Sequence, residues 1–345
     1  MNFMSDNVVG AAPQIMAALQ AANEGAVGSY GADPWTARVE KRLAELFETE
    51  VTVFPVATGT AANSLALSVM TPPWGAVYCH PDSHINTDEC GAPEMFTGGA
   101  KLVAVEGGYG KVDPDALRDA LAAAHPGFVH AVQPAALSLS QATEAGTAYT
   151  PGEVAELAGI ARRHKLLVHM DGARFANAVA HLGCAPADVT WRAGVDALSF
   201  GATKNGALTA EAVVLFRRDL AESFGYRRKR AGHLLSKMRF VSAQLDAYLE
   251  DGLWLKLAGH ANAMAARLAT GLSALPGVAL RDPVEANELF VAMPEAMVAG
   301  LEARGFRFYR WDDRVIRLVT AWNTERASVD AFVAAAAELS DDRNP

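Results

Sequence analysis

Short apolar runs alternate with segments of helical periodicity through the first two-thirds of the chain. Each run is followed by polar or glycine-containing positions, which is the pattern of strands buried on both faces of a sheet. Helices are predicted between the runs, because Asp33, Asp113 and Thr150 each place a capping side chain before a proline. The predicted strands are residues 51–56, 77–79, 101–105, 128–132, 166–170, 195–200 and 212–216.

The pattern changes after about residue 245. A long alanine- and leucine-rich helical segment over 253–275 is followed by two strand-like runs, 289–293 and 315–319. Alternation of strands and helices in the first part predicts a mostly parallel sheet with helices on both faces. We therefore expect an α/β protein with a large domain over residues 1–245 and a smaller α+β domain over residues 246–345.

Composition narrows the class of protein. The 345 residues are 51% hydrophobic, which is enough for about two domains without disulfide support. The three cysteines form no Cys-x-x-Cys pair, which favours a reduced, cytoplasmic location. The net charge of −9 disfavours nucleic acids and anionic membranes as partners. No signal peptide and no run of roughly 18 apolar residues is apparent, so no membrane association is expected.

Two predicted strand ends carry the residues that say most about chemistry. Asp171 directly follows the run 166–170, and Lys204 lies in the small-residue loop after the run 195–200. Ligand sites in such sheets lie at the carboxyl ends of the strands. A pyridoxal 5'-phosphate (PLP) enzyme needs this pair, because the lysine forms a Schiff base with the cofactor aldehyde and the carboxylate keeps the pyridine nitrogen protonated. Each residue alone is more often structural, but the combination favours PLP.

Two other strand ends carry candidate cofactor contacts. Gly59 and Thr60 stand at a strand-to-helix turn, where backbone N–H groups can bind an anion. The chain has neither a G-x-G-x-x-G nor a G-x-x-x-x-G-K-[ST] motif, which counts against nucleotide binding. The His84 imidazole could stack on the pyridine ring and shuttle protons. A metal site formed by His84, Asp88 and Glu89 is disfavoured, since their spacing matches no strong ligand motif.

Two arginines are candidates for binding a carboxylate. Arg174 follows Asp171 by three residues, which places its guanidinium near the same ring, suited to a carboxylate or a phenolate-like oxygen. Arg317 lies in an apolar strand-like run, where a charge is costly to bury unless it is paired. Its partner is either a protein carboxylate or the carboxylate of a substrate, and both alternatives stay open.

Many ordered blocks along the chain give it a family resemblance. It resembles the threonine aldolases of the β-eliminating lyase group, most closely the bacterial low-specificity L-threonine aldolases. The resemblance implies a fold-type I PLP-dependent transferase fold with active sites at a dimer interface, often within a homotetramer. The matching blocks are residues 5–7, 30–33, 59–63, 84–93, 141–146, 169–175, 201–206, 236–239 and 317–319.

The resemblance implies a role for each matching cofactor residue. Lys204 would attach the cofactor, Asp171 would pair with the pyridine nitrogen, and His84 would stack on the ring and take part in proton chemistry. Gly59 and Thr60 would bind the phosphate. The other implied cofactor contacts come from Arg174 and from Arg239 of the partner subunit.

It also implies a set of substrate contacts. Ser5, Arg174 and Arg317 would hold the substrate carboxylate, and Tyr30 would enter from the neighbouring chain. The chain departs from some relatives at Glu144, where they carry a histidine. The base that receives the hydroxyl proton is therefore His84, Glu144 or a water molecule, and the choice stays open.

The activity implied by the resemblance is retro-aldol cleavage of β-hydroxy-α-amino acids. L-threonine or L-allo-threonine would give glycine and acetaldehyde, with broad tolerance at Cβ. The alternatives are phenylserine cleavage, β-elimination, or a non-catalytic protein that binds PLP or an amino acid. The sequence leaves the order of preference among these substrates open.

Overall fold

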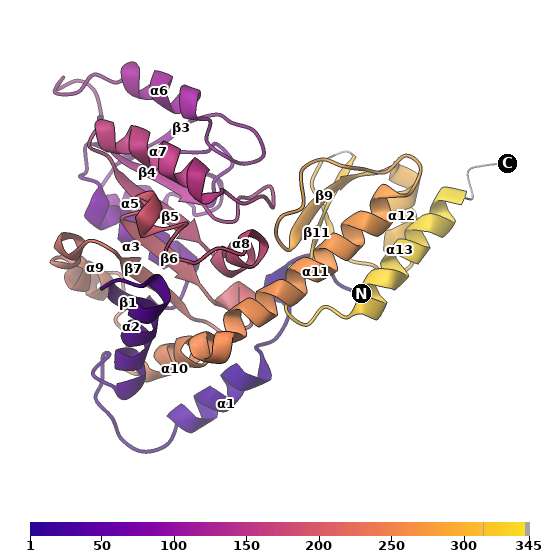
Figure 1. Cartoon of the computed structure of the whole chain (residues 1–345), viewed down its shortest axis with the longest axis horizontal. Coiled ribbons are helices and arrows are strands. Elements are labelled where there is room, and N and C mark those ends of the chain that lie inside the picture. The colour runs from indigo at the N-terminus through magenta and orange to yellow at the C-terminus, as the bar shows by residue number, and fades with distance from the viewer. Residues whose placement is uncertain (313, 342–345) are drawn as a thin grey trace.

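In the computed structural model, which describes residues 1–312 and 314–341, a seven-stranded sheet forms the larger of two bodies (Figure 1). Its strands are β1 (Thr52–Val56), β2 (Gly75–Cys79), β3 (Lys101–Ala104), β4 (Gln133–Ser140), β5 (Leu167–Gly172), β6 (Ala197–Gly201) and β7 (Glu211–Leu215). They lie in the order β1-β7-β6-β5-β4-β2-β3, and β7 alone runs antiparallel to its neighbours within this sheet. The expected mostly parallel α/β sheet is confirmed.

Helices cover both faces of this sheet. The predicted starts are confirmed, because Asp33 and Asp113 accept backbone N–H groups of the first turn and Thr150 forms a reciprocal capping box with Glu153. The helices of the larger body are α1 (Pro13–Ala22), α2 (Pro34–Phe47), α3 (Gly59–Met70), α4 (His84–Thr87), α5 (Ala92–Thr97), α6 (Pro114–Ala122), α7 (Pro151–Arg163), α8 (Phe175–Leu182), α9 (Phe224–Arg230) and α10 (Arg239–Leu249).

One predicted strand is wrong. Residues 128–132 lie in turns, and the strand β4 begins only at Gln133. The Gln133 side chain accepts the Gly127 N–H and donates to the carbonyls of Phe128 and Ala131, which closes this segment into a loop. Phe128 is 53% exposed and Val129 88% exposed, so the apolar composition of the segment does not reflect burial.

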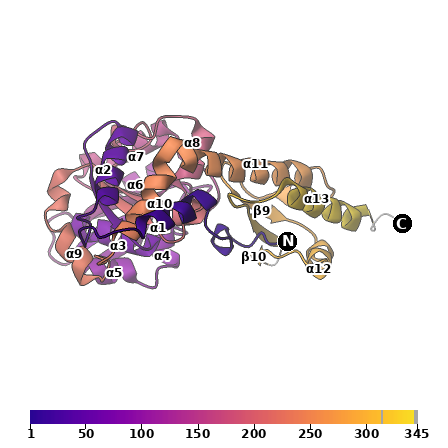
Figure 2. The ribbon, with the colours of Figure 1, turned by 90° about the horizontal axis from the view of Figure 1, so that it is seen from below.

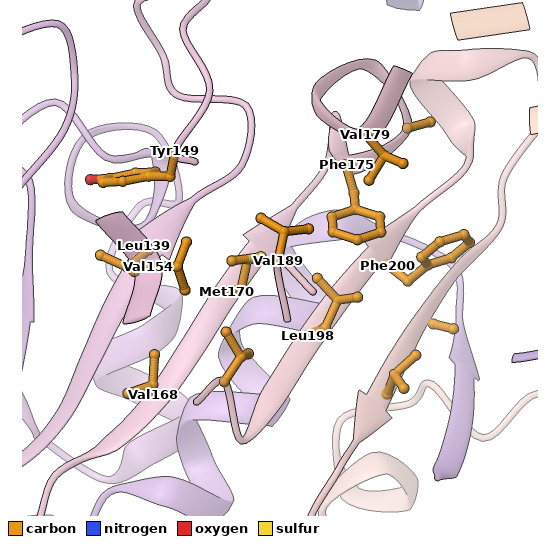
Figure 3. Close-up of a cluster of buried hydrophobic side chains, with 14 of the residues drawn as sticks. Leu139, Tyr149, Val154, Val168, Met170, Phe175, Val179, Val189, Leu198 and Phe200 are labelled. Carbon is orange, nitrogen blue, oxygen red and sulfur yellow. The ribbon is translucent and has the colours of Figure 1, made fainter. Parts of the chain in front are cut away.

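The alternation of side chains along the central strands separates the core from the site. Leu139 of β4, Met170 of β5 and Leu198 of β6 are buried on one face, where Phe175 and Val179 of α8 cover them (Figure 3). Since successive side chains of a strand point to opposite faces, the next residue of each strand faces away from this core. Those residues are Ser140, Asp171 and Ser199, which are in register with one another.

The smaller body is an antiparallel sheet packed against helices. Its strands lie in the order β10 (Tyr309–Arg310), β11 (Val315–Val319), β9 (Glu288–Ala292), β8 (Ala279–Leu280), and its helices are α12 (Glu295–Ala303) and α13 (Arg326–Asp341). The helix α11 (Leu253–Ser273) runs from the larger body into the smaller one (Figure 2). Trp254 packs in the core of the larger body, and Leu268 and Leu272 pack in that of the smaller.

The N-terminal segment also belongs partly to the smaller body. Phe3 is buried in the smaller core, and its carbonyl accepts the Val319 N–H at 2.8 Å. The expected domain boundary near residue 245 stays a prediction. Within the described ranges, no helix has both the length and the apolar character needed to cross a membrane.

Candidate active site

Two adjoining cavities lie where the carboxyl ends of the central strands meet the N-terminal segment and the smaller body. The first has a volume of about 340 Å³ and the second about 520 Å³. We call the first the inner compartment; its lining includes Gly59, Thr60, His84, Asp171, Arg174 and Lys204. We call the second the outer compartment; its lining includes Ser5, His84, Arg174, Lys204 and Arg317.

The fold thus brings to one place eight of the ten residues to which the resemblance assigns a cofactor or substrate contact. The other two, Tyr30 and Arg239, line neither compartment. Tyr30 is 48% exposed with a backbone φ of 58°, and the Arg239 guanidinium donates to the Gly25 carbonyl. Their expected entry into a neighbouring subunit's site stays a prediction.

Asp171 is held at the end of β5 by two donors. Its Oδ1 accepts the Ala173 N–H at 3.0 Å, and its Oδ2 accepts Nδ2 of Asn63 at 2.7 Å. Asn63 lies in the second turn of α3, and the same Nδ2 reaches Oε1 of Glu89 at 2.8 Å. The Asp171 carboxylate at the pocket wall is therefore held by α3, which covers the face of the sheet opposite the Phe175 core.

His84 is oriented by the same network. Its Nδ1 lies 2.8 Å from Oε1 of Glu89, whose side chain is fully buried, and its backbone N–H donates to Glu144 at 2.8 Å. The hydrogen bond to Glu89 raises the pKa of His84 above its ordinary value, although burial acts in the opposite direction. The His84 imidazole beside the inner compartment therefore binds a proton more tightly than an ordinary histidine does.

Lys204 stands on a short 3₁₀ turn, Thr203–Asn205, that follows β6. Asn205 anchors this turn from behind, since its Nδ2 donates to the Tyr248 hydroxyl at 2.7 Å and to the Trp254 carbonyl at 2.8 Å. Among the described residues, no carboxylate forms an ion pair with the Lys204 amine. The backbone is therefore rigid while the amine lines both compartments.

The N-terminus of α3 is a candidate anion-binding site. Thr58 caps the helix through the Ala61 N–H at 3.2 Å, and no heavy atom lies within 4 Å of the position that a Cβ on Gly59 would take. Gly59 and Thr60 line the inner compartment, so the start of this 12-residue helix, where backbone N–H groups can bind an anion, lies at the pocket. A helix terminus, an amine, a strand-end carboxylate and an imidazole together suit a flat pyridine aldehyde that carries a phosphate.

Arg174 is already paired with two buried carboxylates. Its Nε and Nη2 donate to Asp6 at 2.8 and 3.2 Å, and its Nη1 lies 2.9 Å from Oε2 of Glu288. The Asp6 and Glu288 side chains are only 1% and 2% exposed. Burial acts to raise the pKa of Asp6, but Arg174 and Lys204 outweigh burial and hold it below its ordinary value.

Arg317 keeps donors available, in contrast. Its Nη1 is 3.8 Å from Glu288, its Nη2 donates to the Met4 carbonyl at 3.3 Å, and its buried Nε has no hydrogen-bond partner among the described residues. The rings of Tyr309 and Trp311 flank the guanidinium, with centroids 5.0 and 5.5 Å from Cζ. The Arg317 guanidinium thus has a protein carboxylate nearby, that of Glu288, but the contact is weak and leaves room for a substrate carboxylate.

Sequence reasoning assigned no role to two residues that organise the site. Asn63 lies one helical turn after Gly59, so its spacing from the anion site could have indicated that it faces the pocket. Glu288 of β9 gives no such signal, because only the packing of the smaller body brings it to Arg174.

The chain is similar to known proteins along nearly its whole length. The low specificity L-threonine aldolase of Pseudomonas aeruginosa is 45% identical over 324 residues, which cover 94% of this chain and 93% of the relative. The solved threonine aldolase of Leishmania major has a TM-score of 0.92 and 30% identity, covering 98% of this chain and 99% of that one. A solved structure of SPT with PLP has a TM-score of 0.72 at 15% identity, covers 99% of this chain and 88% of that one, and shares the fold. The family model of the beta-eliminating lyases matches residues 2–296, and the chain belongs to that family.

Proposed function

We propose that this chain is a PLP-dependent lyase that cleaves β-hydroxy-α-amino acids, with L-threonine and L-allo-threonine as substrates that yield glycine and acetaldehyde. One observation carries the proposal: the Lys204 amine and the Asp171 carboxylate line one compartment, at the carboxyl ends of two neighbouring parallel strands. The 45% identity to an L-threonine aldolase supports this reaction over the other reactions of the fold.

The inner compartment offers a candidate contact for each part of the cofactor. When bound, PLP supplies an aldehyde that takes up an amine and a pyridinium ring that withdraws electrons from the amino acid's Cα. Lys204 would attach it, and Asp171, held by Asn63, would accept the pyridinium N–H. Gly59 and Thr60 at the start of α3 would bind the phosphate, and His84 would lie against the ring.

The outer compartment suits the substrate. Arg317, whose Nη1 has only a 3.8 Å contact with Glu288, and the neighbouring Ser5 would bind the carboxylate. Arg174 lines the same space, but its charge is already paired with Asp6 and Glu288, so Arg317 takes the larger share of the substrate charge. Fixing the carboxylate selects which bond at Cα is aligned with the electron-withdrawing ring, and thus selects Cα–Cβ cleavage.

The lysine assignment is tested by paired substitutions. Lys204→Ala should abolish the visible absorption band of the purified protein and aldehyde release from threonine. Lys101→Ala is the matched control, because Lys101 is exposed at the opposite end of the sheet, at the start of β3. A band that persists in Lys204→Ala without added amine would reject the assignment.

Product analysis separates the competing reactions. Glycine and an aldehyde from threonine, allo-threonine or phenylserine indicate retro-aldol cleavage, whereas pyruvate from serine indicates β-elimination. Phenylserine belongs in the assay because Tyr109 and Trp311 place two aromatic rings on the wall of the outer compartment. Absence of every one of these products would leave the binding-protein alternative.

We also propose that Tyr30 and Arg239 complete the site of a partner subunit in a homodimer or homotetramer. Both lie outside the compartments of their own chain. Mixing Lys204→Ala subunits with Arg239→Ala subunits, after dissociation and reassembly, should restore part of the activity. No recovery in assembled hybrids would argue that each chain forms its site alone.

A further inference from the structure

The side chain of Arg317 is restrained by aromatic rings rather than by a close ion pair. Its guanidinium carbon lies 5.0 Å from the ring centroid of Tyr309 and 5.5 Å from that of Trp311. The only carboxylate paired with it in the described part of the chain is that of Glu288, at 3.8 Å. Arg174 shows the other arrangement, because two carboxylates hold its guanidinium at 2.8 and 2.9 Å.

The smaller sheet places aromatic side chains directly beside Arg317. In the register of that sheet, Arg317 of β11 lies opposite Tyr309 of β10 on one side and Phe290 of β9 on the other. Side chains directly opposite each other on neighbouring strands share a face of the sheet and are close enough to interact. Arg317 therefore stands between two aromatic residues in one row across the sheet, and its side chain lines the outer compartment.

Trp311 is held in place although half of its surface is exposed. Its ring meets the buried Phe290 ring edge to face, with centroids 5.1 Å apart, and its backbone N–H donates to the Val315 carbonyl at 2.8 Å. Phe290 has a second neighbour, because the guanidinium carbon of Arg281 lies 4.2 Å from its ring centroid. An anchored ring beside a long, flexible side chain removes much of the rotational freedom of that side chain.

Aromatic restraint suits an arginine that has to receive an anion. The face of a ring attracts a cation but carries no carboxylate, so it does not compete with an incoming carboxylate for the charge. Without the rings, the Arg317 side chain would be free to turn and to close the 3.8 Å gap to Glu288. A substrate carboxylate would then have to order the guanidinium and displace that partner. Ordering one such side chain on binding lowers the affinity by a factor of roughly 2–12.

We propose that Tyr309 and Trp311 are positioning residues that hold the Arg317 guanidinium in place for the carboxylate of the substrate. This inference rests on the proposed function, which puts that carboxylate at Arg317. Tyr309 lines neither compartment, so its effect on binding passes through Arg317. Trp311 lines the outer compartment and contacts the same guanidinium. The two rings thus set the affinity for the carboxylate and take no part in bond cleavage.

The first test compares ligands with and without a carboxylate, using the holoenzyme. The double variant with Tyr309→Leu and Trp311→Leu should raise KM for threonine, and the calorimetric dissociation constant of glycine, by roughly 3–10-fold, and should change kcat by less than about 2-fold. Glycine has no Cβ substituent, so a contact between Trp311 and the substrate side chain does not contribute. 1-Amino-2-propanol, which is threonine without its carboxylate, should bind the variant and the wild type equally.

A double-mutant cycle tests whether the rings act through Arg317. In an Arg317→Met background, the two leucine substitutions should leave the dissociation constant of glycine unchanged within about 2-fold. Tyr309→Phe combined with Trp311→Phe should keep KM within about 3-fold of wild type, because a phenylalanine ring also attracts a cation. Trp74→Leu is the matched control, since Trp74 is also an exposed tryptophan and lies just before β2, at the opposite end of the larger sheet from the site.

The outcomes distinguish this inference from the proposed function. A wild-type protein that cleaves no β-hydroxy-α-amino acid overturns the proposed function and this inference with it. Wild-type affinity for glycine in the double leucine variant overturns this inference alone. Equal weakening of glycine and 1-amino-2-propanol also overturns it, because the rings would then support the whole site. An undiminished effect of the leucine substitutions in the Arg317→Met background overturns it as well, because the rings would then act independently of Arg317.

Discussion

A buried histidine in the central strand should make the stability of this protein strongly dependent on pH. His169 of β5 is 0% exposed, and its two ring nitrogens lie 2.9 Å from the Ser138 hydroxyl of β4 and 3.0 Å from the Ser199 hydroxyl of β6. Burial lowers the pKa of His169 from its ordinary 6.5 to about 4, although Asp171 acts in the opposite direction. The folded protein thus holds this ring neutral where the unfolded chain protonates it.

The sign and size of the effect follow from proton linkage. Between pH 6.5 and about 4 the unfolded chain binds a proton that the folded protein does not, so the free energy of unfolding falls as the pH falls through this window. At about 1.4 kcal/mol per pH unit, the loss from this one residue is about 3 kcal/mol at pH 4 relative to pH 7. Above pH 6.5 its contribution is constant.

Urea unfolding followed by circular dichroism between pH 8 and pH 4 measures this loss. His169→Gln has no ring to protonate, so between pH 7 and pH 4 it should lose about 3 kcal/mol less unfolding free energy than the wild type. His164→Gln, at an exposed histidine at the end of α7, is the control and should follow the wild-type curve. Parallel pH curves for wild type and His169→Gln would refute the reasoning.

Two further substitutions test buried polar contacts. Arg174→Met leaves the carboxylates of Asp6 and Glu288 buried without their cation and should cost about 3–5 kcal/mol of unfolding free energy at pH 7. Its penalty should shrink in acid as the Asp6 carboxylate protonates, and a change below about 1 kcal/mol in urea unfolding would contradict the pairing. Tyr149→Phe removes the hydroxyl that accepts the Val112 N–H at 2.6 Å. It should cost about 1–3 kcal/mol, measured by thermal unfolding, and an unchanged Tm would argue that water replaces the hydroxyl.

Local sequence patterns predicted most of the helices and strands. The capping residues Asp33, Asp113 and Thr150 begin helices as expected, because a side chain that satisfies the first N–H groups acts within one turn. The strand predicted at residues 128–132 is wrong, because apolar composition alone does not specify burial. Gln133 closes that segment into an exposed loop through contacts that the pattern does not reveal.

The sequence by itself determined the alternating strands and helices, the two strand ends that carry Asp171 and Lys204, and the family resemblance that the comparisons confirm. These depend on local periodicity or on ordered motifs, which the linear chain contains. Only the tertiary structure decided that Arg174 is paired with two buried carboxylates while Arg317 has only a distant contact with Glu288. It also decided that Glu144 lines both compartments. The physical reason is that burial and charge pairing depend on segments far apart in the chain, which come together only when both bodies have folded.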